Sequence, residues 1–200
     1  MNEIAKVRPR VLQTTQGAAG MPRYSWSLSQ FDKLVEHGFI QESDRVELIG
    51  GELVPMSPKG NRHEVVRDEL LNWMSRRLPE GVRVSSELGW RPAEDMYLEP
   101  DLMVRPATGP GVTASGADLW LVIEVSDSSL RFDTGAKAMI YASLGVREYW
   151  VVDANSLETT VHLGPSAEGY ANVSTYPGSA TLTPTIAPAL ALSLGGLEIG

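Results

Sequence analysis

The sequence predicts a mixed α/β (α+β) fold, and three segments carry this prediction. Residues 119–125 form a near-continuous apolar run, which is typical of a strand covered on both faces. Residues 133–145 show a helical pattern that ends at a glycine, with Asp133 or Thr134 as its cap. Residues 147–153 are rich in aromatic and β-branched side chains, as strands are. With one strand upstream, the order strand, strand, helix, strand indicates a central mixed sheet flanked by helices.

The segments before this core predict a helix and a hairpin. A capping box at 27–30 begins a predicted helix over 26–38. The pair Gly50–Gly51 separates two apolar runs within 45–57, as a two-residue hairpin turn requires, and Glu47 shares a face of that hairpin with apolar residues. The other predicted elements are a helix over 61–81 capped by Asn61, strands over 82–88 and 97–106, a meander over 158–163 and 170–176, and a strand at 190–194.

Length and composition limit the possible functions. The chain has 200 residues, and residues 1–22 are polar and aperiodic, so we expect a flexible tail followed by one domain over 23–200. The absence of cysteine excludes disulfides, cysteine zinc sites and thiol nucleophiles, and it fits a reducing compartment. No apolar run is long enough to cross a membrane and no signal core is present, so we expect a cytoplasmic protein. The net charge of −8 argues against a broad basic face for nucleic acid.

The most informative charged residues are Asp101, Glu124 and Lys137. Asp101 follows Pro100 at a predicted strand, Glu124 interrupts an apolar strand, and Lys137 lies on the next helix. Two converging carboxylates can hold a hard divalent cation, and a nearby ammonium can stabilise developing negative charge, which suits metal-assisted phosphodiester cleavage. The alternatives are a turn aspartate, a salt-bridged glutamate at a strand end, and a lysine paired with Asp133 on a solvated helix face.

Two further polar residues are weaker candidates. Glu47 could be an outer ligand or an exposed strand residue, and His63 could orient a water or a phosphate or be an exposed histidine at a helix start. His37 and His162 have the context of surface residues, and Tyr141 is expected in the core or at its rim. The sequence contains no phosphate-binding glycine loop, no nucleophile elbow and no zinc spacing, so those chemistries are excluded.

The acid, acid and lysine pattern resembles the PD-(D/E)xK nuclease superfamily. Two longer strings, RVELIGGELVPMSPKGNRHEVV at 45–66 and IEVSDSSLRFDTGAKAMIYASLGVREYWVVD at 123–153, resemble its Uma-type branch of bacterial restriction-endonuclease-like proteins. The similarity runs from Ser25 to the C-terminus. Gly50 stands where the branch often has Asp, a difference that concerns the hairpin turn.

This resemblance implies a restriction-endonuclease-like core and a metal site. Asp101, Glu124 and the carbonyl of Val125 would bind Mg²⁺ or Mn²⁺. The usual lysine position holds Ser126, so Lys137 would reach the same point from the following helix.

Glu47 and His63 match other recurring polar positions of the branch. The implied function is a divalent-metal-dependent DNA endonuclease, expected as a homodimer because two strands are cut. A non-catalytic oligomeric or regulatory scaffold, and an enzyme that hydrolyses a smaller phosphoester, remain as alternatives, because a fold does not fix a substrate. The aromatic residues Tyr149 and Trp150, expected at the surface, are compatible with the scaffold.

Overall fold

The computed structural model describes residues 14–16 and 20–199, except the side chains of Thr14–Gln16 and Glu42. The described residues group into two compact units, one up to Pro55 with Ala93–Tyr97, and one formed by Met56–Pro92 and the residues from Leu98 onward. Most of the tail predicted over residues 1–22 lies outside the described residues. Two compact units can still unfold together as one domain, so the prediction of a single domain over 23–200 stays a prediction.

The first unit contains the predicted helix and hairpin. The capping box is present, because the Gln30 N–H donates to Ser27 Oγ at 3.3 Å and the Ser27 N–H donates to Gln30 Oε1 at 2.9 Å. Gly50 and Gly51 have φ values of 57° and 79°, as a primed hairpin turn requires. The elements of this unit are β1 (Thr14–Gln16), β2 (Pro22–Tyr24), α1 (Leu28–Glu36), η1 (Glu42–Asp44), β3 (Val46–Ile49) and β4 (Glu52–Pro55).

The second unit is built on a six-stranded mixed sheet in the order β10-β9-β8-β7-β6-β5, in which only β7 and β8 are parallel. The strands are β5 (Val82–Ser86), β6 (Leu102–Pro106), β7 (Leu121–Ser126), β8 (Glu148–Asp153), β9 (Thr159–Ser166) and β10 (Gly169–Tyr176). The helical segments are α2 (Asn61–Ser75), η2 (Gly116–Asp118), α3 (Leu130–Phe132), the π-helical turn η3 (Asp133–Lys137), α4 (Ala138–Ser143), η4 (Pro188–Leu190) and η5 (Leu194–Gly196). This architecture confirms the predicted mixed sheet with flanking helices.

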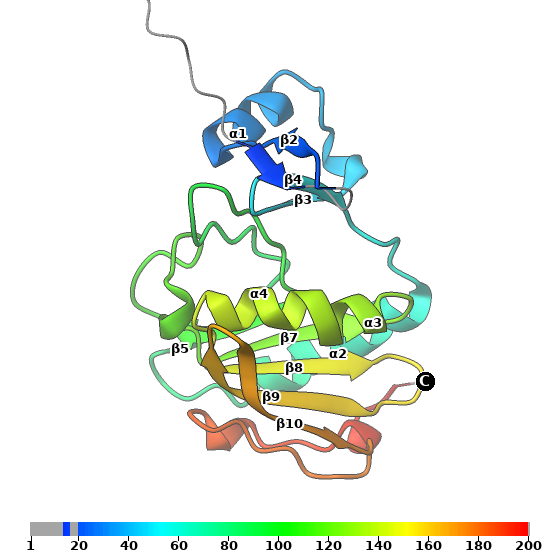
Figure 1. Ribbon diagram of the computed structural model, residues 1–200. Helices are drawn as coiled ribbons and strands as arrows, with labels where there is room; N and C mark the ends of the chain where they lie inside the picture. The colour runs from blue at the N-terminus through cyan, green and yellow to red at the C-terminus, as the bar shows by residue number, and fades with distance from the viewer. Residues whose placement is uncertain (1–13, 17–19, 200) are drawn as a thin grey trace, which may run out of the picture. The chain divides into compact units, whose positions relative to one another are not determined.

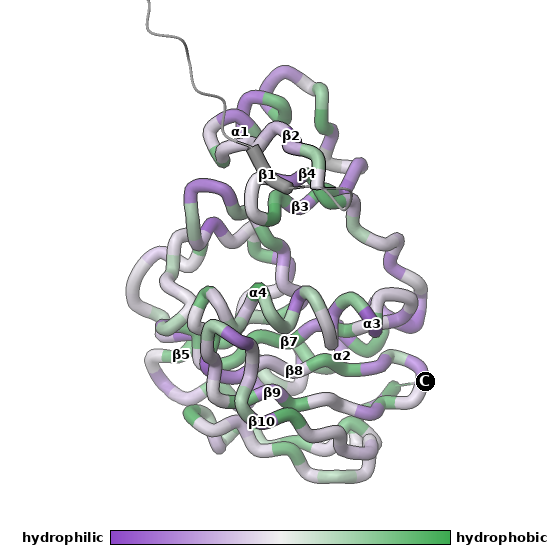
Figure 2. The backbone as a smooth tube through the Cα atoms, in the orientation of Figure 1, coloured by the Kyte–Doolittle hydropathy of each residue, from purple (hydrophilic) through white to green (hydrophobic). Residues whose placement is uncertain are grey.

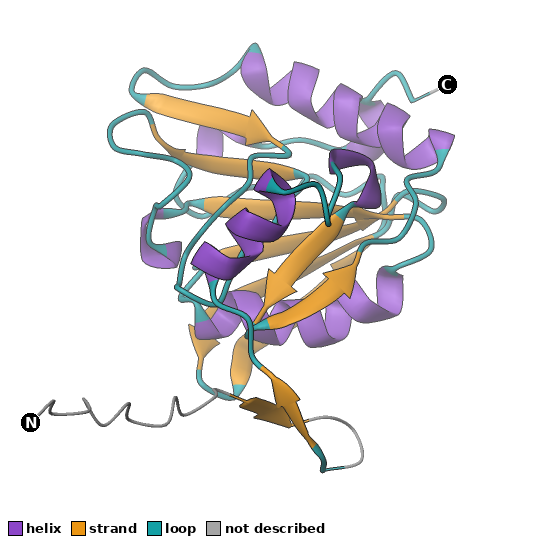
Figure 3. Cartoon of the chain, turned by 90° about the horizontal axis from the view of Figure 1, so that it is seen from above, coloured by secondary structure: helices purple, strands orange, loops and turns teal. Residues whose placement is uncertain are grey.

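Helices cover both faces of this sheet, with α2 on one face and α3 to α4 on the other (Figures 1 and 3). Every residue of β7 is buried, and hydrophobic residues follow one another along it (Figure 2). On the α2 side, Val66, Leu70 and Met74 form an apolar stripe and pack in the core with Ile123. No helix within the described residues has the length and hydropathy needed to span a bilayer.

Several predicted boundaries are wrong, and the helix predicted over 61–81 ends at Ser75. The helix predicted from 133 begins earlier, at Leu130, and Asp133 lies inside a π-helical turn instead of capping it. Helix α2 has Gly60 as its N-cap, so the expected cap Asn61 is its first residue. The strand expected over 97–106 begins only at Leu102. The strand expected at 190–194 is a single bridge between Leu182 and Leu192, because two short 3₁₀ turns flank it.

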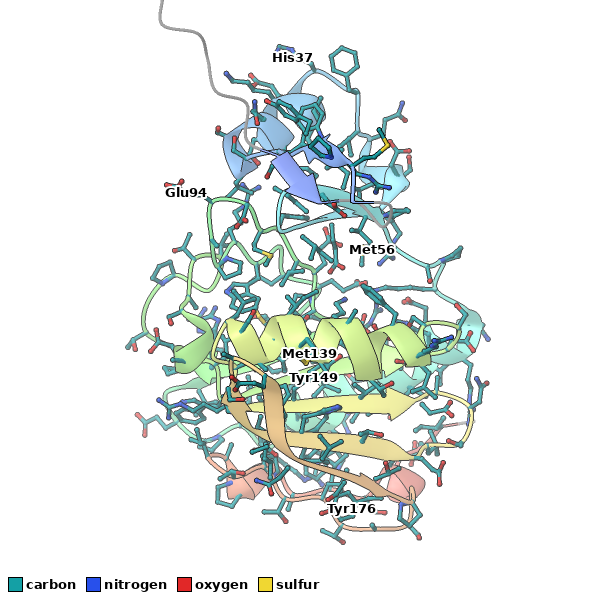
Figure 4. The ribbon with its side chains drawn as sticks, viewed as in Figure 1. His37, Met56, Glu94, Met139, Tyr149 and Tyr176 are labelled. Carbon is teal, nitrogen blue, oxygen red and sulfur yellow. The ribbon has the colours of Figure 1, made fainter. Side chains whose placement is uncertain are left out.

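Three residues expected at the surface are buried. Tyr149 and Trp150 lie on β8 and are at most 1% exposed. Tyr149 lies between β8 and the helix that carries Met139, and its ring centroid is 4.7 Å from that of Tyr141 (Figure 4). His162 pairs with Tyr149 across β8 and β9, and its ring lies 5.2 Å from that of Tyr149 at a tilt of 34°. His162 is buried as well.

The burial of His162 predicts a stability that depends on pH. Burial lowers the pKa of His162 despite hydrogen bonds with backbone groups such as that of Tyr149. The unfolded chain therefore takes up the proton first, so His162 adds stability above its unfolded pKa of about 6.5, and that stability is lost as the pH falls from there toward the folded pKa. Urea unfolding between pH 7.5 and 5.5 should show this loss in the wild type and a flatter profile in His162→Gln.

The exposed histidine control is His37→Gln, which should keep the wild-type profile. Equal slopes for the wild type and His162→Gln would contradict the assignment.

Candidate active site

Three acidic residues lie opposite one another at one end of the sheet. Asp101 is the residue just before β6, which pairs antiparallel with β5 and with β7. When these pairings are extended by one residue, Asp101 lies opposite Glu87 on the β5 side and opposite Glu124 on the β7 side. The Glu87 N–H lies 3.2 Å from the carbonyl oxygen of Asp101, and the Asp101 N–H lies 3.4 Å from Glu124 Oε2. Asp101 and Glu124, the two acidic residues singled out in the sequence, therefore lie at opposing positions of neighbouring strands.

Asp101 is buried and bound on both carboxylate oxygens. Its Oδ2 accepts from the Val125 N–H at 2.9 Å and lies 3.1 Å from His63 Nε2, and its Oδ1 accepts from Lys59 Nζ at 2.9 Å. Burial alone would raise the pKa of Asp101, but the interactions with His63, Lys59 and the Val125 N–H lower it below its usual value. Asp101 is therefore a buried carboxylate held by two basic side chains. The alternative of an aspartate that serves only a turn does not account for these contacts.

Glu124 is equally buried and faces the helix on the other side of the sheet. Its Oε1 accepts from the Tyr141 hydroxyl at 2.6 Å and from Lys137 Nζ at 3.0 Å. A buried carboxylate needs such partners, because leaving an ionised group without them costs several kcal/mol. The lone charge in the apolar strand is thus explained by a hydroxyl and an ammonium that come from one helix.

Lys137 reaches Glu124 because of the π-helical turn. This turn buries both of its ends, Asp133 and Lys137, where a regular helix surface would face water. Asp133 Oδ2 accepts from Ser126 Oγ at 2.6 Å and from Ser129 Oγ at 2.5 Å, and burial raises the pKa of Asp133. The alternative of a lysine on a solvated helix face is wrong, since only 6% of the Lys137 side chain is exposed.

His63 lies in the first turn of α2 and points into the site. It is buried, with Nε2 at Asp101 and Nδ1 at 3.4 Å from Glu64 Oε1. An exposed histidine at a helix start is therefore excluded. His63 holds the Asp101 carboxylate from the face opposite to that of Lys137.

Two charged residues of the site, Lys59 and Glu87, were not predicted from the sequence, and the role of Tyr141 was underestimated. Lys59 bridges Asp101 and Glu87, and Tyr141, expected only as core or rim, is the hydroxyl donor to Glu124. Glu87 and Asp101 both lie inside strands predicted from the sequence, over 82–88 and 97–106, and a charged residue within such a strand was the signal available for Glu87. Lys59 stands four residues before His63 in a loop, and no local pattern marks it.

Two predicted site residues have roles that stay predictions. Glu47 lies on β3 in the first unit and is buried, with a side chain that shares its face with Ile49. Val125 contributes its N–H to Asp101, whereas the use of its carbonyl as a metal ligand is not tested by the geometry.

The chemistry of the site suits a hard divalent cation. Asp101 and Glu124 offer carboxylate oxygens from opposing strand positions, and hard cations prefer oxygen ligands. Among the described residues no group of three histidine, aspartate or glutamate side chains is arranged to hold a metal ion. Magnesium sites that act on phosphates use one or two carboxylates and fill the remaining positions with water and substrate, so the pair fits such a site.

Comparisons with known proteins agree with this fold. One solved structure, described as a putative nuclease belonging to DUF820 from Anabaena variabilis, superimposes with a TM-score of 0.67 over 84% of this chain and 95% of that chain, at 17% identity. At that identity the similarity shows the fold, a mixed α+β architecture of the nuclease-like kind. A search of curated proteins found no match. The family model described as "Putative restriction endonuclease" matches residues 28–195, and the chain therefore belongs to the Uma2 family.

Proposed function

We propose that this protein is a divalent-metal-dependent endonuclease that hydrolyses DNA phosphodiester bonds. One observation carries the proposal. Two buried carboxylates, Asp101 and Glu124, lie opposite each other, and the buried ammonium of Lys137 lies 3.0 Å from one of them. Burying so much charge is costly, and a scaffold has no physical use for it. Metal-assisted phosphoryl chemistry does use it.

Asp101 and Glu124 would hold Mg²⁺ or Mn²⁺, with the carbonyl of Val125 as a further ligand. When bound, such an ion polarises a phosphate oxygen and lowers the pKa of a coordinated water. The residues around the pair support this use. The Val125 N–H and His63 fix the Asp101 carboxylate, and Tyr141 fixes Glu124, so neither group must reorganise when a ligand arrives.

Lys137 would stabilise the negative charge that develops on the phosphate, or orient the attacking water. Its position is fixed by the π-helical turn and by Glu124, so its ammonium needs little rearrangement during the reaction. His63 would hold Asp101, and a role of Glu47 as an outer polar residue stays a prediction. A homodimer would supply two such sites for the two strands of a duplex.

The net charge of −8 opposes the binding of DNA, which is itself negatively charged. Phosphate binding normally relies on lysine and arginine. The bound cation together with Lys137 would supply that positive charge locally.

Replacing Asp101 should remove cleavage. Asp101→Asn keeps the shape of the side chain but removes the charge, so plasmid nicking in Mg²⁺ or Mn²⁺ should fall by at least about 100-fold. Calorimetric titration should show that Mn²⁺ binding is lost while the circular dichroism spectrum is retained. Glu158→Gln, an exposed carboxylate of the same unit, is the matched control and should cleave like the wild type. Equal cleavage by Asp101→Asn and the wild type would assign the activity to a contaminant.

Replacing Lys137 should separate chemistry from metal binding. Lys137→Met should lower the single-turnover cleavage rate by about 100-fold, because a fixed cation no longer meets the developing charge. It should leave Mn²⁺ binding measurable, since both carboxylates remain. Lys33→Met removes an exposed lysine and serves as the control. A Lys137→Met protein that cleaves at the wild-type rate would rule out the role of Lys137, and cleavage of bis(p-nitrophenyl) phosphate with no cleavage of DNA would favour a smaller phosphoester as substrate.

A further inference from the structure

Both proposed metal ligands already carry a lysine ammonium. Lys137 lies 3.0 Å from Glu124, and Lys59 lies 2.9 Å from Asp101. The two negative charges of the pair are thus balanced by two positive charges from the chain itself. A cation that binds the pair must meet at least one of these ammonium groups, and like charges that share a poorly solvated carboxylate repel strongly.

The two lysines differ in what else they can bind. Lys59 contacts a second carboxylate, Glu87, at the same time as Asp101. The Glu87 side chain is 36% exposed, against 5% for that of Asp101, so Glu87 lies at the outer side of the cluster. Arg67 Nη1 holds Glu87 at 2.9 Å, and the contacts with Lys59 and Arg67 lower the pKa of Glu87 although burial acts in the other direction. Glu87 is therefore an ionised and anchored acceptor beside Asp101.

The loop that carries Lys59 has a restricted position. Gly60 follows Lys59 as the N-cap of α2, and a β-carbon on Gly60 would collide with the carboxylate of Asp127 just after β7. Arg62 Nε also donates to the carbonyl oxygen of Ala154 at 3.0 Å, which fixes the first turn of the helix. With the start of α2 held by this bond, Lys59 can change acceptor through its flexible side chain.

We propose that Lys59 is an internal counter-ion that competes with the divalent cation for Asp101, and that Glu87 retains the Lys59 ammonium when the cation displaces it. This inference rests on the proposed function, because it takes Asp101 as a metal ligand. Lys59 then keeps the buried carboxylates neutral in the metal-free protein and weakens cation binding by the strength of one charge-assisted hydrogen bond. Glu87 reduces the cost of displacing Lys59, because the Lys59 ammonium stays bound to this neighbouring carboxylate and does not enter the core.

The test is a calorimetric titration of the full chain with Mn²⁺ in the absence of DNA. Lys59→Met removes the competitor, so the Mn²⁺ dissociation constant should fall by about tenfold, the factor expected for one such hydrogen bond. Lys59→Arg keeps the charge and should bind Mn²⁺ like the wild type. Lys33→Met controls for the loss of one positive charge elsewhere on the chain. Circular dichroism checks that each variant is folded.

Glu87→Gln should have the opposite effect and weaken Mn²⁺ binding, because the displaced ammonium loses its second acceptor. In the Lys59→Met background the same change should have no effect, since no ammonium remains to be held. Weakening by Glu87→Gln in both backgrounds would make Glu87 a metal ligand and overturn the proposal.

The outcomes separate this inference from the proposed function. Mn²⁺ binding that depends on Asp101 but is unchanged or weaker in Lys59→Met overturns the role of Lys59 and leaves the metal site intact. Binding that appears only in Lys59→Met and is lost again in Lys59→Met/Asp101→Asn supports both. No Mn²⁺ binding by the wild type or by Lys59→Met overturns both.

Discussion

The opposition of Asp101 and Glu124 across the end of two antiparallel strands is the interaction on which the rest of the second unit depends. Two carboxylates that are 4% exposed repel each other and lose hydration, so the fold must supply compensating groups. It does so from three directions, with His63 on α2, Lys59 on the preceding loop, and Lys137 and Tyr141 on the helix across the sheet. Each of these elements therefore brings a cation or a hydrogen-bond donor to the pair.

The π-helical turn is the local consequence of the same constraint. One extra residue in the turn from Asp133 to Lys137 rotates the lysine inward, and the hydroxyls of Ser126 and Ser129 satisfy the Asp133 carboxylate that is buried with it. The lysine is therefore thirteen positions after Glu124 in sequence yet in direct contact with it. Ser126, two residues after Glu124, supports this arrangement because its hydroxyl donates to Asp133.

Charge balance links the fold to the proposed chemistry. Without a metal, each carboxylate of the pair contacts a lysine ammonium, which offsets the cost of burying it. The same contacts make cation binding a competition, because each ammonium near the pair lowers the gain from a new positive charge. A substrate phosphate restores the balance, so metal and substrate are expected to favour each other's binding, as linked ligands do.

The sequence by itself determined the elements whose signals are local. The capping box at 27–30, the double-glycine turn and the apolar β7 are encoded by neighbouring residues, and the structure confirms each of them. It also marked Glu124, because a charge in an apolar strand is conspicuous wherever the strand lies, and it marked Asp101 in combination with Glu124 and Lys137. Only the tertiary structure decided which charges meet. Lys59 and Asp101 are 42 positions apart, and their contact depends on a strand register and a loop path that no local pattern records. The surroundings of His162 and Tyr149 were likewise set by the helix packed over β9, since a strand's composition does not say which of its faces is covered.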